Sequence, residues 1–333
     1  MYVFKHLGMA ALASCLFAVP VTGFAASSGV VKLGLGQPEG SLGHITCVKF
    51  KEIIEKESNG RFTVNIFPGE QMGSDLEMVE ATQMGNLTAA SVAASGVGAF
   101  NKDYFVLDMP FMFKDRAEAY EVLDGKFGQA LLQSLEKLNI KAPVFYENGF
   151  RHVTNSKRPV HKPEDVKSLK LRTMQNAIHL ALWKELGANP TPMGFGEVFV
   201  ALQQKTIDGQ ENPPMQVWDN KLYEVQPYMS LTYHIYSPMV LVLNKDFFDA
   251  LSDDDKKLFQ SASEQMRDYN RIEAQKLASE TIEKLKGTGM ITINTLTDEE
   301  HNLFREKAKA VRPMIEERLS PEILAMFKEH MDK

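Results

Sequence analysis

The sequence has little cysteine and lacks the common motifs of metal binding. Only 2 of its 333 residues are Cys, which excludes a small scaffold held together by disulfides. The eight His residues are scattered, and neither a His-x-x-x-His nor a Cys-x-x-Cys spacing occurs. We therefore expect no metal site and no bound cofactor.

Signatures of phosphate binding and nucleophilic catalysis are also missing. Gly34 and Gly36 follow a predicted strand, but neither the third glycine of a dinucleotide fingerprint nor the Lys-Ser/Thr pair of a P-loop comes after them. Gly-x-Ser-x-Gly does not occur, and Cys47 stands in no known nucleophile motif. The motifs give no positive support for an enzyme, and we expect no catalytic residue.

An excess of basic charge is absent as well. Acidic residues outnumber basic ones by 43 to 37, the formal net charge is -6, and no long basic run is present. This balance argues against a nucleic-acid partner. A chain of 333 residues, 44% of them hydrophobic, exceeds one ordinary core and predicts two domains. Because no Pro/Gly/Ser-rich linker occurs, we expect several ordered crossovers between them.

The N-terminus carries the one long apolar run. Lys5 precedes an apolar stretch over Leu7–Val21, and small residues follow at 23–25, which predicts a cleaved signal peptide over residues 1–25 and export of the remaining chain. Leu12 to Cys15 also resembles a lipobox, so lipidation of Cys15 is the alternative, although the residues after Cys15 remain apolar. No later stretch approaches the 18 apolar residues that suggest a membrane-spanning helix.

Hydrophobic periodicity and turn residues predict alternating strands and helices. The order strand, helix, strand at the start of the chain favours a parallel sheet in an α/β fold. The predicted strands are Val30–Gly36, Phe62–Phe67, Ala89–Ala94, Val144–Tyr146 and Leu169–Thr173. The predicted helices are His44–Lys56, Glu77–Met84, one or two within Asp115–Leu138, Ile178–Leu186 and Phe195–Gln204.

A much longer helix is predicted near the C-terminus. Ser252 and Asp255 form a capping box, and apolar residues keep helical spacing until Gly287. About 35 residues at 1.5 Å each give a length of roughly 50 Å, more than the width of one domain. We expect this helix to cross both domains; the alternative is a break near residues 268–270. Thr297 and Glu300 predict the start of the next helix.

Two arginines lie where predicted strands end. Arg151 follows Asn148-Gly149-Phe150, and Arg172 lies within Leu169–Thr173. In an open α/β sheet, ligands bind beyond the carboxyl ends of the strands, and a guanidinium suits a bidentate contact with a carboxylate. A surface salt bridge is the alternative for either residue.

Several strings in the chain carry a family resemblance. The segment 189–213, NPTPMGFGEVFVALQQKTIDGQENP, together with Leu169-Lys170-Leu171-Arg172, closely resembles the DctP-type substrate-binding subunits of tripartite ATP-independent periplasmic (TRAP) transporters. The resemblance extends in order over the whole chain after residue 25. Further matching strings begin at Phe67, Asp108, Asn148 and Tyr223.

The resemblance implies a two-lobed α/β fold of the periplasmic-binding-protein kind, each lobe a mixed sheet flanked by helices, with a long helix spanning both. On this basis we expect lobe I at 26–149 plus about 238–270, and lobe II at 150–237 plus about 271–333. It implies a monomeric receptor without a cofactor, located in the periplasm. This receptor would close over a small organic acid and deliver it to the small and large permease subunits in the membrane.

The resemblance also implies the binding residues of lobe II. Arg172 matches the family's arginine that pairs with the substrate carboxylate, and Asn212 matches the asparagine that hydrogen-bonds the same group. Phe195 matches an aromatic position in the cleft, and Arg151 a second arginine that reaches the ligand in some members. Because the mature net charge of -7 cannot attract an anion, we expect attraction to rest on Arg151 and Arg172.

For lobe I the resemblance implies further contacts. Asp75 falls at a cleft position that is polar in sialic-acid binders, whereas Ala93 replaces an acid that those binders carry, which argues against sialic acid. Gln37, Glu39 and His44 on the first loop are also expected contacts, with solvated loop residues as the alternative.

The leading hypothesis is a receptor for a uronate, an aldonate or a C4-dicarboxylate. A secreted two-domain hydrolase or lyase is an alternative, with Glu39, His44 and Asp75 as its acid and base candidates. A ligand-sensing receptor for a signalling kinase is a third possibility.

Overall fold

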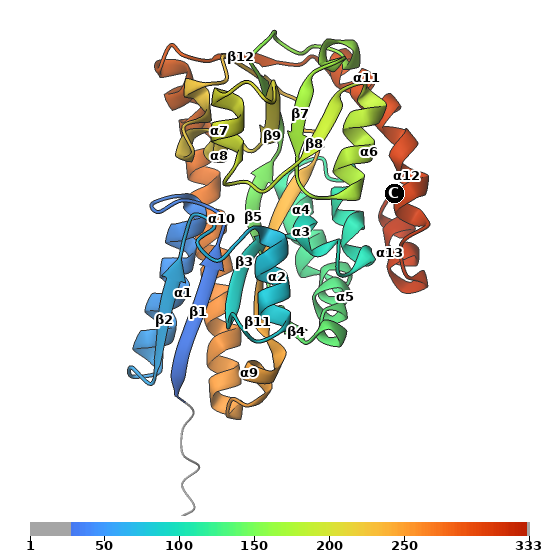
Figure 1. Ribbon diagram of the computed structural model, residues 1–333. Helices are drawn as coiled ribbons and strands as arrows, with labels where there is room; N and C mark the ends of the chain where they lie inside the picture. The colour runs from blue at the N-terminus through green and yellow to red at the C-terminus, as the bar shows by residue number, and fades with distance from the viewer. Residues whose placement is uncertain (1–27, 332–333) are drawn as a thin grey trace, which may run out of the picture.

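The computed structural model describes residues 28–331, which form two mixed β-sheets flanked by helices (Figure 1). The first sheet has the order β2-β1-β3-β11-β4, with β5 also paired to β11. Its strands are β1 (Gly29–Leu35), β2 (Phe62–Phe67), β3 (Ala89–Ala93), β4 (Ile140–Lys141), β5 (Phe145–Phe150) and β11 (Tyr236–Asn244).

The second sheet, in the upper half of Figure 1, has the order β12-β10-β6-β9-β7-β8. Its strands are β6 (His152–Asn155), β7 (Lys170–Thr173), β8 (Asn189–Pro192), β9 (Gly209–Asn212), β10 (Tyr228–Leu231) and β12 (Thr292–Thr295). The α/β fold with two helix-flanked mixed sheets is therefore confirmed. The predicted lobe boundaries stay a prediction.

The α-helices pack around both sheets. They are α1 (Leu42–Glu57), α2 (Asp75–Gln83), α3 (Ala94–Val97), α4 (Arg116–Asp124), α5 (Lys126–Ser134), α6 (Ala177–Leu186), α7 (Val198–Gln203), α8 (Pro214–Asp219), α9 (Lys245–Asp249), α10 (Asp253–Gly287), α11 (Asp298–Ala308), α12 (Arg312–Glu316) and α13 (Pro321–Met331). None of the helices within residues 28–331 is both long and apolar enough to cross a membrane. The predicted signal peptide and the alternative lipidation at Cys15 lie outside the described residues.

Most of the predicted elements are present, with shifted ends. Strand β2 has the predicted bounds, and β1 and β2 pair in parallel as expected. The predicted helix at 195–204 is shorter, because Phe195 lies in the loop before α7. Strand β11 escaped prediction: all nine of its residues are buried, so it lacks the alternation of a half-exposed strand. Its antiparallel pairing with β3 makes the first sheet mixed.

Helix α10 runs past both sheets without the break considered at residues 268–270 (Figure 1). Ser252 caps its start by accepting a hydrogen bond from the Asp255 amide, a contact worth about 1 kcal/mol. Near that end Phe259 packs edge-on against Phe62 at 5.2 Å between ring centroids. Near the other end Leu285 lies in the hydrophobic cluster beneath α7 and α8. One continuous helix thus contributes to the cores on both sides.

The chain also crosses between the sheets at two places that lie side by side. Arg151 separates β5 of the first sheet from β6 of the second, and residues 232–235 connect β10 to β11. The two crossings are joined by a hydrogen bond of 2.8 Å from the Arg151 amide to the Ile235 carbonyl. The expectation of several ordered crossovers is therefore confirmed.

Candidate functional site

An open cavity lies between the two sheets. Its empty volume is about 620 Å³, which includes the solvent space at its mouth. On one side it is reached by the carboxyl ends of β1, β2 and β3, and on the other by those of β7, β8 and β9. Ligands bind beyond such strand ends in open α/β sheets. The lining residues are Gly36, Gln37, Glu70, Ser74, Asp75, Leu76, Ala93, Gly96, Asn148, Arg151, Arg172, Met174, Gln175, Met193, Gly194, Phe195, Asn212, Gln216 and Met239.

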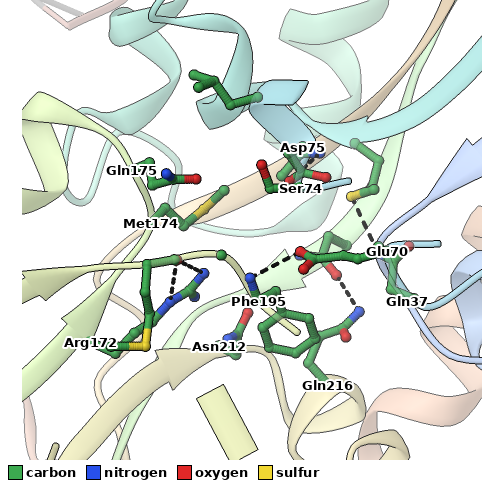
Figure 2. Close-up of a pocket in the computed structure, with 18 of the residues that line it drawn as sticks. Gln37, Glu70, Ser74, Asp75, Arg172, Met174, Gln175, Phe195, Asn212 and Gln216 are labelled. Atoms are coloured by element: carbon green, nitrogen blue, oxygen red, sulfur yellow. Dashed lines mark hydrogen bonds between the residues drawn. The ribbon is translucent and has the colours of Figure 1, made fainter. Parts of the chain in front are cut away.

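Arg172 lies in β7 and is only 3% exposed (Figure 2). Its Nε and Nη2 donate to the carbonyl of Met193 at 3.1 and 2.8 Å, and its guanidinium carbon lies 5.6 Å from the centre of the Phe195 ring. Within the described residues no carboxylate forms an ion pair with it. Desolvation and the nearby Arg151 lower the pKa of Arg172 to about 10, so it stays charged at neutral pH.

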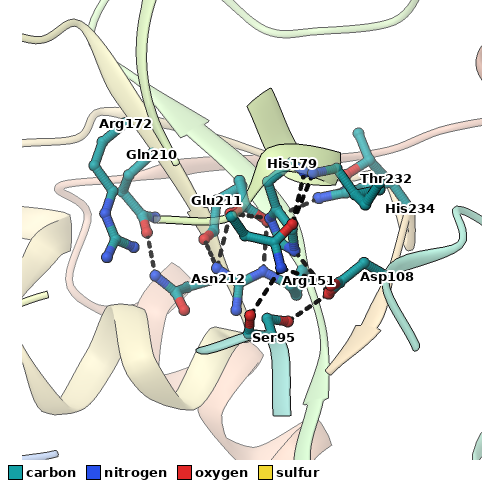
Figure 3. Close-up of polar contacts among 12 residues, drawn as sticks. Ser95, Asp108, Arg151, Arg172, His179, Gln210, Glu211, Asn212, Thr232 and His234 are labelled. Carbon is teal, nitrogen blue, oxygen red and sulfur yellow. Dashed lines mark hydrogen bonds and ion pairs between the residues drawn. The ribbon is translucent and has the colours of Figure 1, made fainter. Parts of the chain in front are cut away.

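Asn212, at the end of β9, lies beside Arg172 in the cavity wall (Figure 3). Its Nδ2 donates to Gln210 Oε1 at 2.6 Å, which fixes the orientation of the amide. A charged planar donor and an oriented amide are therefore available together on this wall. Such a pair can replace the water contacts of a carboxylate.

Arg151 is 1% exposed and already has an acidic partner (Figure 3). Its Nε and Nη2 both contact the Glu211 carboxylate, the latter at 2.8 Å, and Nη2 also donates to the Glu211 carbonyl. Burial alone would raise the pKa of Glu211, but Arg151 and two histidines outweigh it and hold this pKa well below its usual range. The charge of Arg151 is therefore balanced within the protein by Glu211, and its part in attracting a ligand stays a prediction.

The charged network continues behind the cavity. Glu211 also contacts His234 Nε2 at 3.0 Å and His179 Nδ1 at 3.5 Å. His179 Nε2 lies 3.1 Å from Asp108 Oδ1, and Asp108 accepts a further hydrogen bond from Asn176 at 2.7 Å. Burial lowers the pKa of His179, but Asp108 and Glu211 outweigh this and raise it to about 9. Arg151 is therefore held by a chain of buried charges.

The wall opposite Arg172 is acidic. Asp75 begins α2, and its Oδ2 accepts a hydrogen bond from the Ala93 amide at 3.3 Å. Desolvation and the neighbouring Glu70 raise the pKa of Asp75 to about 7. Glu70 reaches across the cavity, where its two oxygens accept from the amides of Phe195 and Gly196 at 2.9 and 2.8 Å. Glu70 thus links the loop after β2 to the loop after β8.

Seven of the nine expected ligand residues line the cavity: Gln37, Asp75, Ala93, Arg151, Arg172, Phe195 and Asn212. Glu39 and His44 do not line it. Glu39 is exposed, and His44 lies in the first turn of α1, where its Nδ1 accepts a hydrogen bond from the Gly40 amide at 3.2 Å. Ser41 caps α1 directly after the first loop, which places His44 on the helix.

Sequence reasoning missed several lining residues, of which Glu70 and Gln216 are the most informative. Glu70 follows the Pro68-Gly69 turn directly after a strand, and Gln216 follows β9 by four residues. Both could have been found from the sequence as polar residues just beyond the carboxyl end of a strand, where ligands bind in open α/β sheets. In the described part of the chain no group of three or more His, Cys, Asp or Glu is arranged to hold a metal ion.

A cavity between two sheets, entered by the carboxyl ends of both sets of parallel strands, is the geometry of a two-lobed ligand-binding protein. The family model for bacterial extracellular solute-binding protein, family 7 (DctP) matches residues 34–318. The chain belongs to this family, which confirms the resemblance stated from the sequence.

Relatives of the chain share most of its length. It is 36% identical over 264 residues to the 2,3-diketo-L-gulonate-binding periplasmic protein YiaO of Escherichia coli, with 79% of each chain covered. It is 32% identical to the C4-dicarboxylate-binding periplasmic protein DctP of Rhodobacter capsulatus, with 84% of each chain covered. The sugar-acid-binding protein DctPAm of Advenella mimigardefordensis, solved with galactonate, superposes with a TM-score of 0.89 at 30% identity, covering 92% of this chain and 99% of that one.

Proposed function

We propose that this protein is the extracytoplasmic receptor of a TRAP transporter, which binds a small organic acid in the cavity and delivers it to the membrane permease subunits. One observation carries the proposal: Arg172 is a buried, charged guanidinium that faces the cavity without a carboxylate partner among the described residues. An unpaired buried cation is costly, and an anionic ligand relieves that cost. The names of the relatives describe proteins that bind sugar acids or dicarboxylates, which supports an organic acid as the ligand.

The contacts of Glu70 join the two walls of the cavity. Its hydrogen bonds to the amides of Phe195 and Gly196 connect residues from opposite walls. A ligand held by Arg172 on one wall and by Asp75 on the other would bind the closed arrangement better than an open one. Differential binding of this kind shifts the equilibrium toward closure.

A secreted hydrolase or lyase has less support. Of the three residues considered as its acid and base, Glu39 and His44 lie outside the cavity and only Asp75 lines it. Incubation with a bound acid distinguishes the two: a receptor releases the ligand unchanged, whereas an enzyme turns it over. A kinase-coupled sensor would be distinguished by which membrane partner the loaded protein captures.

Arg172→Ala tests the proposal directly. We expect the variant to lose the rise in melting temperature that sugar acids or dicarboxylates cause in the native protein. Arg305→Ala, an exposed arginine on α11, is the matched control and should keep that rise. Native affinity of the Arg172→Ala protein for its acid would contradict the assignment.

A further inference from the structure

The charges around the cavity narrow the ligand class. We infer that the cavity selects an acid with one carboxylate and several hydroxyl groups and rejects a dicarboxylate, with Asp75 and Glu70 as the residues that determine this specificity. This inference rests on the proposed function, because it assumes that Arg172 binds the ligand carboxylate.

The cavity offers one place for a carboxylate. Its charged lining residues are Arg151 and Arg172 on one side and Glu70 and Asp75 on the other. Arg151 is ion-paired with the buried Glu211, so its charge is balanced within the protein. Arg172 is the cation that a ligand carboxylate can neutralise.

The wall contributed by residues 36–96 would repel a second carboxylate. Its charged lining residues, Glu70 and Asp75, are both acids. The Glu70 carboxylate is held in place by the amides of Phe195 and Gly196. A second ligand carboxylate reaching this wall would lose its hydration and meet like charge, without a cation in return.

Asp75 is built to accept hydrogen bonds from a ligand. Its Oδ2 accepts from the Ala93 amide, while its Oδ1 has no hydrogen-bond partner among the described residues. The side chain is packed between two glycines: a Cβ added at Gly36 would lie 3.6 Å from Oδ1, and one added at Gly96 would lie 3.0 Å from the Asp75 Cβ. A fixed carboxylate with a free oxygen suits a hydroxyl donor.

Neutral polar side chains complete the lining. Ser74, Gln175 and Gln216 provide hydroxyl and amide groups around the cavity (Figure 2), and Asn148 adds a further amide. Such groups can both donate to and accept from hydroxyls, whereas none of them balances a negative charge. The composition of the lining therefore fits a chain of hydroxyl groups better than a second carboxylate.

Titration calorimetry of the mature chain tests the inference, with galactonate and erythronate as hydroxylated monocarboxylates and succinate as the dicarboxylate. We expect either sugar acid to bind at least 100-fold more tightly than succinate. Succinate binding as tightly as the sugar acids would overturn the inference while leaving carboxylate binding intact.

Asp75→Asn tests whether Asp75 causes the preference for sugar acids over succinate. We expect the preference for the sugar acid over succinate to narrow at least 10-fold. The exposed Glu39→Gln, with the same change of charge outside the cavity, should alter neither. An unchanged preference in Asp75→Asn would refute its role. If the native protein binds no acid of either class, the proposed function itself fails.

Discussion

Replacement of Glu211 by Gln should strongly destabilise the protein. The Glu211 side chain is fully buried and contacts Arg151, His234 and His179. The amide would keep some hydrogen bonds but remove the negative charge that balances Arg151 and helps keep His179 protonated. Removing one partner of a buried ion pair costs about 3–5 kcal/mol, because the other charge is left uncompensated.

The assay is equilibrium unfolding in urea together with thermal melting at pH 7. For a chain of this size, a loss of about 3–5 kcal/mol corresponds to a fall in melting temperature on the order of 10 °C. Glu197→Gln, an exposed acid in the loop before α7, is the control and should change stability by less than about 0.5 kcal/mol.

A second substitution separates the charge effect from loss of packing. Adding Arg151→Met to Glu211→Gln removes the uncompensated guanidinium, so the double variant should be more stable than Glu211→Gln alone. The reasoning is refuted if Glu211→Gln melts within about 2 °C of the native protein, or if the second substitution destabilises it further.

Two further outcomes follow from the structure. Gly196→Ala should weaken ligand affinity about 10-fold, because the added carbon would lie 2.7 Å from Glu70 Oε2 and displace that carboxylate from the amides across the cavity. Gly287→Ala, at the end of α10 and with no neighbouring atom within 4 Å of the added carbon, is the control; equal affinities for the two variants would contradict the bridging role. Cys47 should react with a thiol reagent at pH 8 about 1,000-fold more slowly than a free thiol, because burial raises its pKa to about 12. Rapid labelling of the native protein would count against this.

The fold was predictable wherever local pattern and tertiary environment agree. Strand β2 alternates buried and exposed residues along its first half, and the Ser252 and Thr297 caps mark the starts of α10 and α11. Strand β11 was missed because every residue in it is buried, which leaves no periodicity to detect.

Residues on the Arg172 side of the cavity were predictable from the sequence, whereas the contact of Glu70 across the cavity was not. Arg172 and Asn212 belong to a segment with a strong family resemblance, whereas Glu70 acts on partners 125 residues further along the chain. The neutralisation of Arg151 depends on the pairing of β6 with β9, which brings Glu211 beside it, and a sequence pattern does not contain that register. His44 was expected to contact the ligand from the first loop. It lies in the first turn of α1 instead, because Ser41 caps that helix directly after the loop.

Helix α10 has a mechanical consequence for how the cavity opens. Its 35 residues form a stiff rod that is embedded in both cores, through Phe259 at one end and Leu285 at the other. The two sheets cannot separate freely while both stay packed on that rod, so opening must proceed by rotation beside it or by bending it. On the proposed function, opening would thereby be limited in amplitude, and a ligand that draws the walls together would have to order little additional chain.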